Sequence, residues 1–141
     1  MNNPERPILL VEDNPMDVDL TLRAFKRRRV TNTILVARDG EEALAWLPRW
    51  DAGETWPAVI LFDLKLPKID GPQVLRQIRA HPRLSVIPVV LLTTSAENSD
   101  VQTAYRLGAI SYIVKPVEFE KFMDVSESIK LYWTVVNQRP Y

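Results

Sequence analysis

Short apolar runs alternate with longer segments of helical period along most of the chain. The first run, Ile8–Val11, has only apolar side chains, as expected of a strand that is covered on both faces. Comparable runs recur at intervals long enough to hold a helix. The pattern predicts five strands, at residues 8–11, 33–37, 58–62, 89–92 and 110–114.

The intervening segments carry helix signals. An amphipathic stretch through Val18, Leu22 and Phe25 follows the first strand, and the later predicted helices cover residues 41–47, 72–80, 99–107 and 118–133. Pro72 suits a first helical turn, and Gly108 suits a helix end. Residues 49–57 are rich in Gly, Pro and polar side chains and are interpreted as a surface loop whose tryptophans pack back on the body.

Strands separated by crossovers of helix length predict a parallel sheet. The fold class is therefore α/β, with βα repeated five times and helices on both faces of a doubly wound five-stranded parallel sheet. A length of 141 residues fits one domain over residues 1–141, with a core at about 6–133 and a short tail at 134–141.

Composition narrows the class of protein. Apolar residues make up 46% and charged residues 26% of the chain, which is a globular composition. Eighteen basic and eighteen acidic residues balance, so the net charge favours neither nucleic acid nor a membrane surface as a partner. Without cysteine, and without a signal peptide at its start, the sequence predicts a cytoplasmic protein.

The chemistry should lie just beyond the carboxyl ends of the strands, where open parallel sheets bind ligands. The residues at these positions are Glu12 and Asp13 after the first strand, Asp63 after the third, Thr93 after the fourth and Lys115 after the fifth. The sequence thus predicts carboxylates, a hydroxyl and an ammonium group at one edge.

Three converging carboxylates repel one another unless a cation lies among them. Mg²⁺ prefers a few carboxylate oxygens, keeps several waters and accepts phosphate oxygens, which matches Glu12, Asp13 and Asp63. Zinc is disfavoured because the chain has one histidine, His81. With Mg²⁺ bound, Asp63 could act as the nucleophile toward a phosphoryl donor, and Lys115 and Thr93 could bind the transferred oxygens.

The motifs resemble those of the response-regulator receiver domain of two-component signalling. ILLVEDN is similar to the family's acidic motif, LFDLKLPKIDG to its phosphoacceptor motif, VVLLTTS to its switch-hydroxyl motif and SYIVKP to its lysine motif, in the family's order. The resemblance covers roughly residues 6–133 and implies a flavodoxin-like fold. SIKLYWTVV and LTTSAENSDV look most like the small regulators that partner bacterial phytochromes.

The resemblance implies a role for each matching residue. Asp63 would be the phosphoacceptor, Glu12 and Asp13 metal ligands, and the backbone carbonyl of Lys65 a further ligand. Thr93 and Lys115 would bind the phosphoryl group, Tyr112 would be the switch aromatic, and the Lys115-Pro116 bond would be cis. Two departures leave questions open. Glu12 stands where the family often has aspartate, and a cation at Lys65 leaves the acylphosphate lifetime undetermined.

The functional prediction is a stand-alone response regulator, not a turnover enzyme, that is phosphorylated by a sensor histidine kinase, with a bacterial phytochrome as one candidate. Two alternatives stay open. One is a receiver-like module that works without phosphorylation. The other is a phosphohydrolase with an aspartate nucleophile, although such enzymes usually place a second acid where this chain has Lys65.

Several residues have simpler interpretations. The basic run at residues 26–29 falls at a helix end, where cations interact favourably with the helix dipole, so it does not indicate nucleic-acid binding. His81 is interpreted as a surface loop residue with no function. Tyr112 could be only a half-buried strand aromatic.

The last predicted helix has more apolar side chains than one sheet-facing stripe requires, which predicts a homodimer through that helix and the tail.

Overall fold

The computed structural model describes residues 6–27, 32–63 and 71–93 and, farther along, residues 102, 105, 106, 108, 109 and 111–114. The elements in chain order are β1 (Ile8–Val11), α1 (Pro15–Arg27), β2 (Ile34–Ala37), α2 (Gly40–Leu44), α3 (Trp46–Asp51), β3 (Val59–Asp63), α4 (Gly71–Ala80), the 3-10 helix η1 (Leu84–Val86), β4 (Val89–Thr93) and β5 (Ser111–Val114). No helix among these residues has both the length and the apolar character needed to cross a bilayer.

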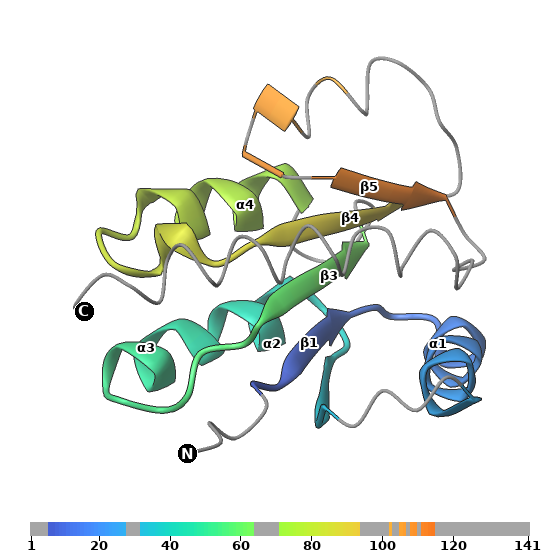
Figure 1. The fold of residues 1–141 in the computed structure, drawn as a ribbon. Coiled ribbons are helices and arrows are strands. Elements are labelled where there is room, and N and C mark those ends of the chain that lie inside the picture. Colours follow the sequence, from blue (N-terminus) through green and yellow to red (C-terminus); the bar gives the residue numbers. More distant parts are fainter. Residues whose placement is uncertain are drawn as a thin grey trace.

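The described strands form one five-stranded parallel sheet in the order β2-β1-β3-β4-β5 (Figure 1). The order reverses direction at β1, because β2 pairs with one edge of β1 and β3 with the other. Right-handed crossovers then place α1 on the opposite face from α2, α3 and α4. The predicted five-stranded, doubly wound α/β fold is confirmed, with strand ends that differ from the prediction by one residue.

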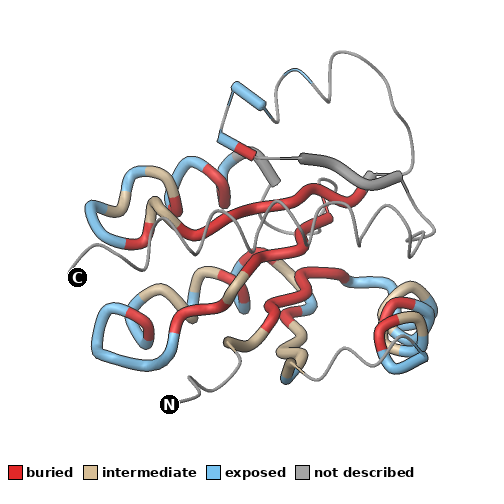
Figure 2. The backbone as a smooth tube through the Cα atoms, in the orientation of Figure 1, coloured by how far each residue is buried: buried red, intermediate tan, exposed pale blue. Residues whose placement is uncertain are grey.

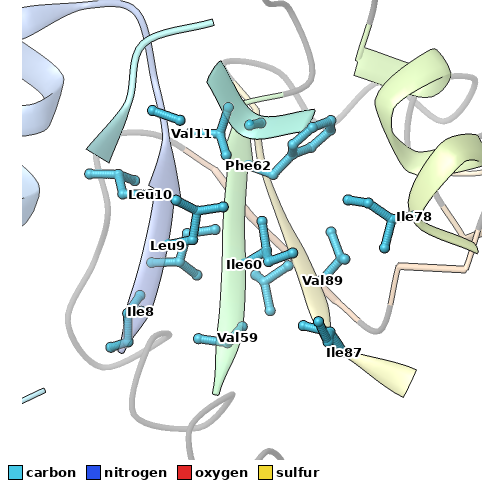
Figure 3. Packing of buried hydrophobic residues seen from close by; sticks show 14 of the residues in the cluster. Ile8, Leu9, Leu10, Val11, Val59, Ile60, Phe62, Ile78, Ile87 and Val89 are labelled. Carbon is cyan, nitrogen blue, oxygen red and sulfur yellow. The ribbon is translucent and has the colours of Figure 1, made fainter. Parts of the chain in front are cut away.

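The sheet carries the core. All side chains of β1 and β3 are buried, which agrees with the continuous apolar runs in the sequence (Figure 2). Figure 3 shows these strands packing with β4 and with Ile78 of α4. Val74, Leu75 and Ile78 form the predicted buried stripe of α4, and Phe25 is the buried anchor of α1. Because β1 and β3 are parallel and buried along their whole length, the loops that follow them lie at the same edge of the sheet.

The predicted surface loop at residues 49–57 is only partly correct. Its first three residues are helical, because α3 continues to Asp51. The helix predicted at residues 41–47 instead divides into α2 and α3 at Ala45. Pro48 explains the division, since proline cannot donate a backbone hydrogen bond and its ring collides with the carbonyl four residues earlier. The tryptophans do pack back, since Trp50 and Trp56 are buried.

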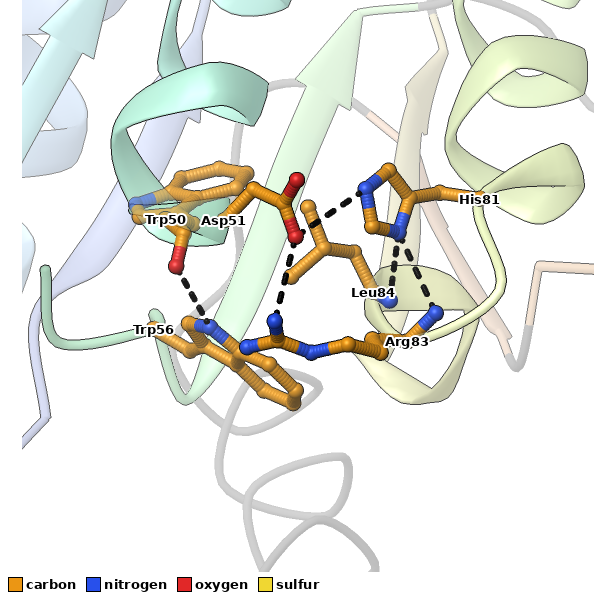
Figure 4. Close-up of polar contacts among 6 residues, drawn as sticks. All are labelled: Trp50, Asp51, Trp56, His81, Arg83 and Leu84. Atoms are coloured by element: carbon orange, nitrogen blue, oxygen red, sulfur yellow. Dashed lines mark hydrogen bonds and ion pairs between the residues drawn. The ribbon is translucent and has the colours of Figure 1, made fainter. Parts of the chain in front are cut away.

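A polar cluster connects the end of α3 to the turn after α4 (Figure 4). His81 Nδ1 accepts hydrogen bonds of 3.1 Å from the backbone N–H groups of Arg83 and Leu84, and its Nε2 lies 3.5 Å from Asp51 Oδ1. Arg83 Nη1 lies 3.3 Å from the same oxygen, and the Arg83 guanidinium lies over the Trp56 ring. His81, to which the sequence assigned no function, therefore has a structural one.

Arg79 joins two segments near the amino ends of β4 and β5. Its Nη1 donates to the carbonyl oxygens of Ser85 and Ile87, the latter at 3.0 Å, and its Nη2 donates to that of Gly108 at 2.8 Å. Gly108 has a φ of 97°, in the region that favours glycine. The predicted helix end at Gly108 is confirmed, and Gln102, Tyr105 and Arg106 before it are helical. The helix predicted at residues 118–133 and the tail lie outside the described residues.

Candidate functional site

The candidate site lies where β1 and β3 end, at the point where the strand order reverses. Val11 of β1 pairs with Phe62 of β3, so the next residues along, Glu12 and Asp63, stand side by side at the sheet edge. This is the place where doubly wound sheets bind ligands. The register of two buried strands therefore brings together acids that are 51 positions apart in the sequence.

Three carboxylates meet there. Glu12, Asp13 and Asp63 each offer a carboxylate oxygen, and these oxygens all lie within 4.8 Å of one another. Glu12 is 1% exposed and Asp63 is 7% exposed, whereas Asp13 faces solvent. A hard divalent cation fits this donor set, because all three groups are oxygen ligands and their charges repel one another without a cation. Asp13 is the one of the three acids that the structure leaves exposed.

Local hydrogen bonds hold the acidic loop in place. The backbone N–H of Glu12 donates to the Ala37 carbonyl at 2.9 Å, which extends the contact between β1 and β2 by one residue. Asn14 Oδ1 accepts from the N–H of Met16 at 2.9 Å, and so caps α1. The loop between these two anchors is therefore short and fixed at both ends.

Of the other predicted site residues, the structure gives strand positions for Thr93 and Tyr112. Thr93 is the last residue of β4 and pairs with Val114 of β5, at the same sheet edge as Asp63. Tyr112 lies within β5 and pairs with Leu91. Lys65 and Lys115 lie outside the described residues. The structure thus brings the three acids together and puts the strand that carries Thr93 beside β3.

Sequence reasoning assigned no role to Asn14. The residue forms the N-cap of α1, and its own N–H donates to Glu12 Oε2 at 3.3 Å. An Asn-Pro pair shortly after a buried strand could have indicated the cap, because asparagine favours that position and proline favours the first helical turn. The contact with Glu12 depends on the fold of the loop and was not predictable from residue types.

Comparison with known proteins gives a consistent result. The model of the response regulator receiver domain matches residues 8–127. This chain belongs to the receiver domain family of two-component signalling. It is 45% identical over 134 residues to the probable methanogenesis regulatory protein FilR2 of Methanothrix harundinacea, covering 94% of this chain and 86% of that protein. The response regulator Rcp1 of Synechocystis is 37% identical, covering 94% and 91% of the two chains.

Solved structures place this receiver domain among small regulators. The bacteriophytochrome response regulator AtBRR matches with a TM-score of 0.81 and 44% identity, covering 93% of this chain and 96% of that one. The Mn²⁺-bound form of Rcp1 matches with a TM-score of 0.71 and 35% identity over 91% and 94% of the chains. The phosphorylated cyanobacterial phytochrome response regulator RcpA gives 0.74 and 36%, over 93% and 95%. The predicted similarity to phytochrome-associated regulators is confirmed.

Proposed function

We propose that this receiver domain accepts a phosphoryl group on Asp63 in the presence of Mg²⁺ and signals through the resulting change of shape. The observation that carries the proposal is the position of Asp63, at the carboxyl end of β3, with its carboxylate among those of Glu12 and Asp13. The similarity to RcpA, described in phosphorylated form, and to Rcp1, described in an Mn²⁺-bound form, supports it.

The chemical step needs a nucleophile and groups that bind the transferred oxygens. An Asp63 oxygen attacks the phosphorus of the donor, the bond from phosphorus to the donor breaks, and the donor's histidine nitrogen leaves with the bonding electron pair. Glu12, Asp13 and the Lys65 carbonyl would hold Mg²⁺, which offsets the charge of the carboxylates and the phosphoryl group. Thr93 and Lys115 would bind phosphoryl oxygens. Tyr112 would transmit the resulting change of shape.

A test combines donor and metal. Purified protein incubated with acetyl phosphate and Mg²⁺ is expected to gain the mass of one phosphoryl group, and excess chelator is expected to prevent the gain because the acidic cluster then repels the donor. Intact-mass spectrometry measures the result. Incorporation that is equal with and without metal would contradict the proposal. Continuous release of phosphate from phosphomonoesters would favour a phosphohydrolase, and no incorporation at all would favour a phosphorylation-independent module.

The partners follow from the same proposal. The donor would be a sensor histidine kinase, and the similarity to bacteriophytochrome regulators makes a phytochrome kinase the first to test. The protein would be cytoplasmic and would signal without catalytic turnover. Its balanced charge, with eighteen basic and eighteen acidic residues, fits partners other than nucleic acid or a membrane surface. Profiling phosphotransfer from a panel of kinases would identify the donor.

The signal would pass through a homodimer that uses the last predicted helix and the tail. The sequence of that segment is unusually apolar, with Phe119, Phe122, Met123, Val125, Ile129, Leu131, Tyr132 and Trp133. Tyr105, before β5, is an exposed aromatic and could extend the interface. Sedimentation of the full chain and of a version ending at Tyr132, each with and without phosphoryl donor, is expected to show a dimer that weakens on truncation. A monomer under all four conditions would remove this proposal.

A further inference from the structure

The loop between β1 and α1 is three residues long and contains two of the three clustered acids. Its first residue, Glu12, is held to β2 through its backbone N–H and the Ala37 carbonyl. Its last residue, Asn14, precedes Pro15, and the proline restricts Asn14 to an extended backbone. Asp13, between them, is exposed. The geometry of the acids therefore depends on how firmly Asn14 is held.

Asn14 is held by three separate contacts with the first turn of α1. Its Oδ1 accepts from the backbone N–H of Met16 at 2.9 Å and of Asp17 at 3.3 Å. Its carbonyl oxygen accepts from the N–H of Val18 at 3.0 Å. Side chain and backbone of Asn14 together satisfy donors that would otherwise be left open at the start of the helix. These contacts restrict the backbone of Asn14 and with it the direction of its remaining backbone group, the N–H.

That N–H points back to the acidic cluster. It donates to Glu12 Oε2 at 3.3 Å, and Glu12 is almost completely buried. A glutamate has one more rotatable bond than an aspartate, so placing its carboxylate for a metal costs more conformational entropy. A fixed backbone donor that already holds one carboxylate oxygen reduces this cost, as outer hydrogen bonds do for many metal ligands.

We propose that Asn14 is a positioning residue for the divalent cation: by capping α1 it fixes the backbone N–H that holds the Glu12 carboxylate in the cluster with Asp13 and Asp63. The proposal rests on the proposed metal-dependent function. It explains how a glutamate can serve as a metal ligand at the end of β1. The side chain is one methylene group longer than that of aspartate, and its carboxylate turns toward the Asn14 N–H.

The test is calorimetric titration of the apoprotein with Mg²⁺ and, separately, with Mn²⁺. Asn14→Ala removes the Oδ1 contacts and is expected to weaken binding of both ions by about tenfold, the lower end of the effect of outer-shell substitutions. Asn14→Ser keeps a capping oxygen and is expected to bind within about twofold of the original protein, since serine caps helices as well as asparagine does. Recovery in the serine variant separates positioning from a general loss of structure.

Three further variants separate a loss of metal binding from a loss of stability. Asn14→Gly also removes Oδ1, but glycine is tolerated at an N-cap with little loss of helix stability, so its weakened metal binding can be measured in folded protein. Asp39 provides the matched control, because its Oδ1 caps α2 by accepting from the Glu42 N–H at 2.9 Å. Asp39→Ala is expected to lower thermal stability relative to Asp39→Asn, yet to bind the ions equally tightly.

The outcomes separate this inference from the proposed function. If the original protein binds neither ion, the metal-dependent function itself is wrong. If the original protein binds and both Asn14→Ala and Asn14→Gly bind equally well, the function stands and the positioning role of Asn14 is wrong. If Asp39→Ala weakens binding relative to Asp39→Asn as much as Asn14→Ala does, the effect is one of helix capping in general, and the inference is overturned as well.

Discussion

Replacing Asp63 with asparagine is expected to reduce phosphoryl incorporation from acetyl phosphate and Mg²⁺ to background. The amide of asparagine has almost the same shape as the carboxylate but is not a nucleophile, so the attack on phosphorus is lost while the packing at the end of β3 stays. Intact-mass spectrometry and radiolabel transfer from a phosphorylated kinase measure the effect. Label that persists in Asp63→Asn would place the phosphorylation on another residue.

The matched control is Asp51→Asn. It makes the same chemical change, at the end of α3, where Asp51 contacts His81 and Arg83 near the amino ends of the strands. This variant is expected to incorporate phosphoryl groups at the original level. A loss in both variants would indicate that a change of net charge, and not the loss of a nucleophile, is responsible.

A second readout follows from ligand linkage. An ion that binds only the folded protein stabilises it by about 2.7 kcal/mol when its concentration is roughly 100 times the dissociation constant. The original protein is therefore expected to gain stability on addition of Mg²⁺. Asp63→Asn should gain less, because one of the three clustered carboxylates is missing. Urea unfolding with and without Mg²⁺ measures the difference.

Substituting Gly108 by alanine is expected to be strongly destabilising. At a φ of 97° a side chain strains the backbone by about 1–3 kcal/mol. The added Cβ would also lie 2.7 Å from Arg79 Nε, whose guanidinium is bound to the Ile87 and Gly108 carbonyls. Displacing it sacrifices charged hydrogen bonds of about 1.5–3 kcal/mol each. Strain plus the loss of one such bond gives a total loss of about 2.5–6 kcal/mol in the free energy of urea unfolding.

Gly53 provides the comparison. Its φ of 115° is as unfavourable for alanine, but a Cβ there would meet nothing within 4 Å. Gly53→Ala should therefore cost only the backbone strain, about 1–3 kcal/mol. Measured within an Arg79→Ala background, the cost of Gly108→Ala should fall to that of Gly53→Ala, since the collision with Arg79 is then removed. Equal losses at the two glycines in the presence of Arg79 would show that the contact with Arg79 has no energetic weight.

The sequence predicted the strands well because their signal is local. Each described strand overlaps an apolar run of at least three residues, and runs of this kind are typical of parallel strands. The helix signals were weaker where two local effects competed. At α2 and α3 the apolar period continued through Ala45, but Pro48 interrupted the hydrogen bonding and ended the first helix there.

The candidate site was predictable to the level of residue types. Residues that directly follow parallel strands share one sheet edge, so Glu12, Asp13 and Asp63 could be placed together from the order of strands and helices alone. The separation of their oxygens and the unequal burial, with Glu12 and Asp63 covered and Asp13 exposed, required the register of β1 against β3.

By itself, the sequence determined the order of strands and helices, the family and the acids at the sheet edge, because apolar periodicity and motif order are properties of neighbouring residues. Only the tertiary structure decided that His81 binds the end of α3, and that Arg79 holds a carbonyl 29 residues away at Gly108. It also decided that the Asn14 N–H meets Glu12. Such contacts depend on where packed helices and strands bring distant groups together, and residue type does not specify that position in advance.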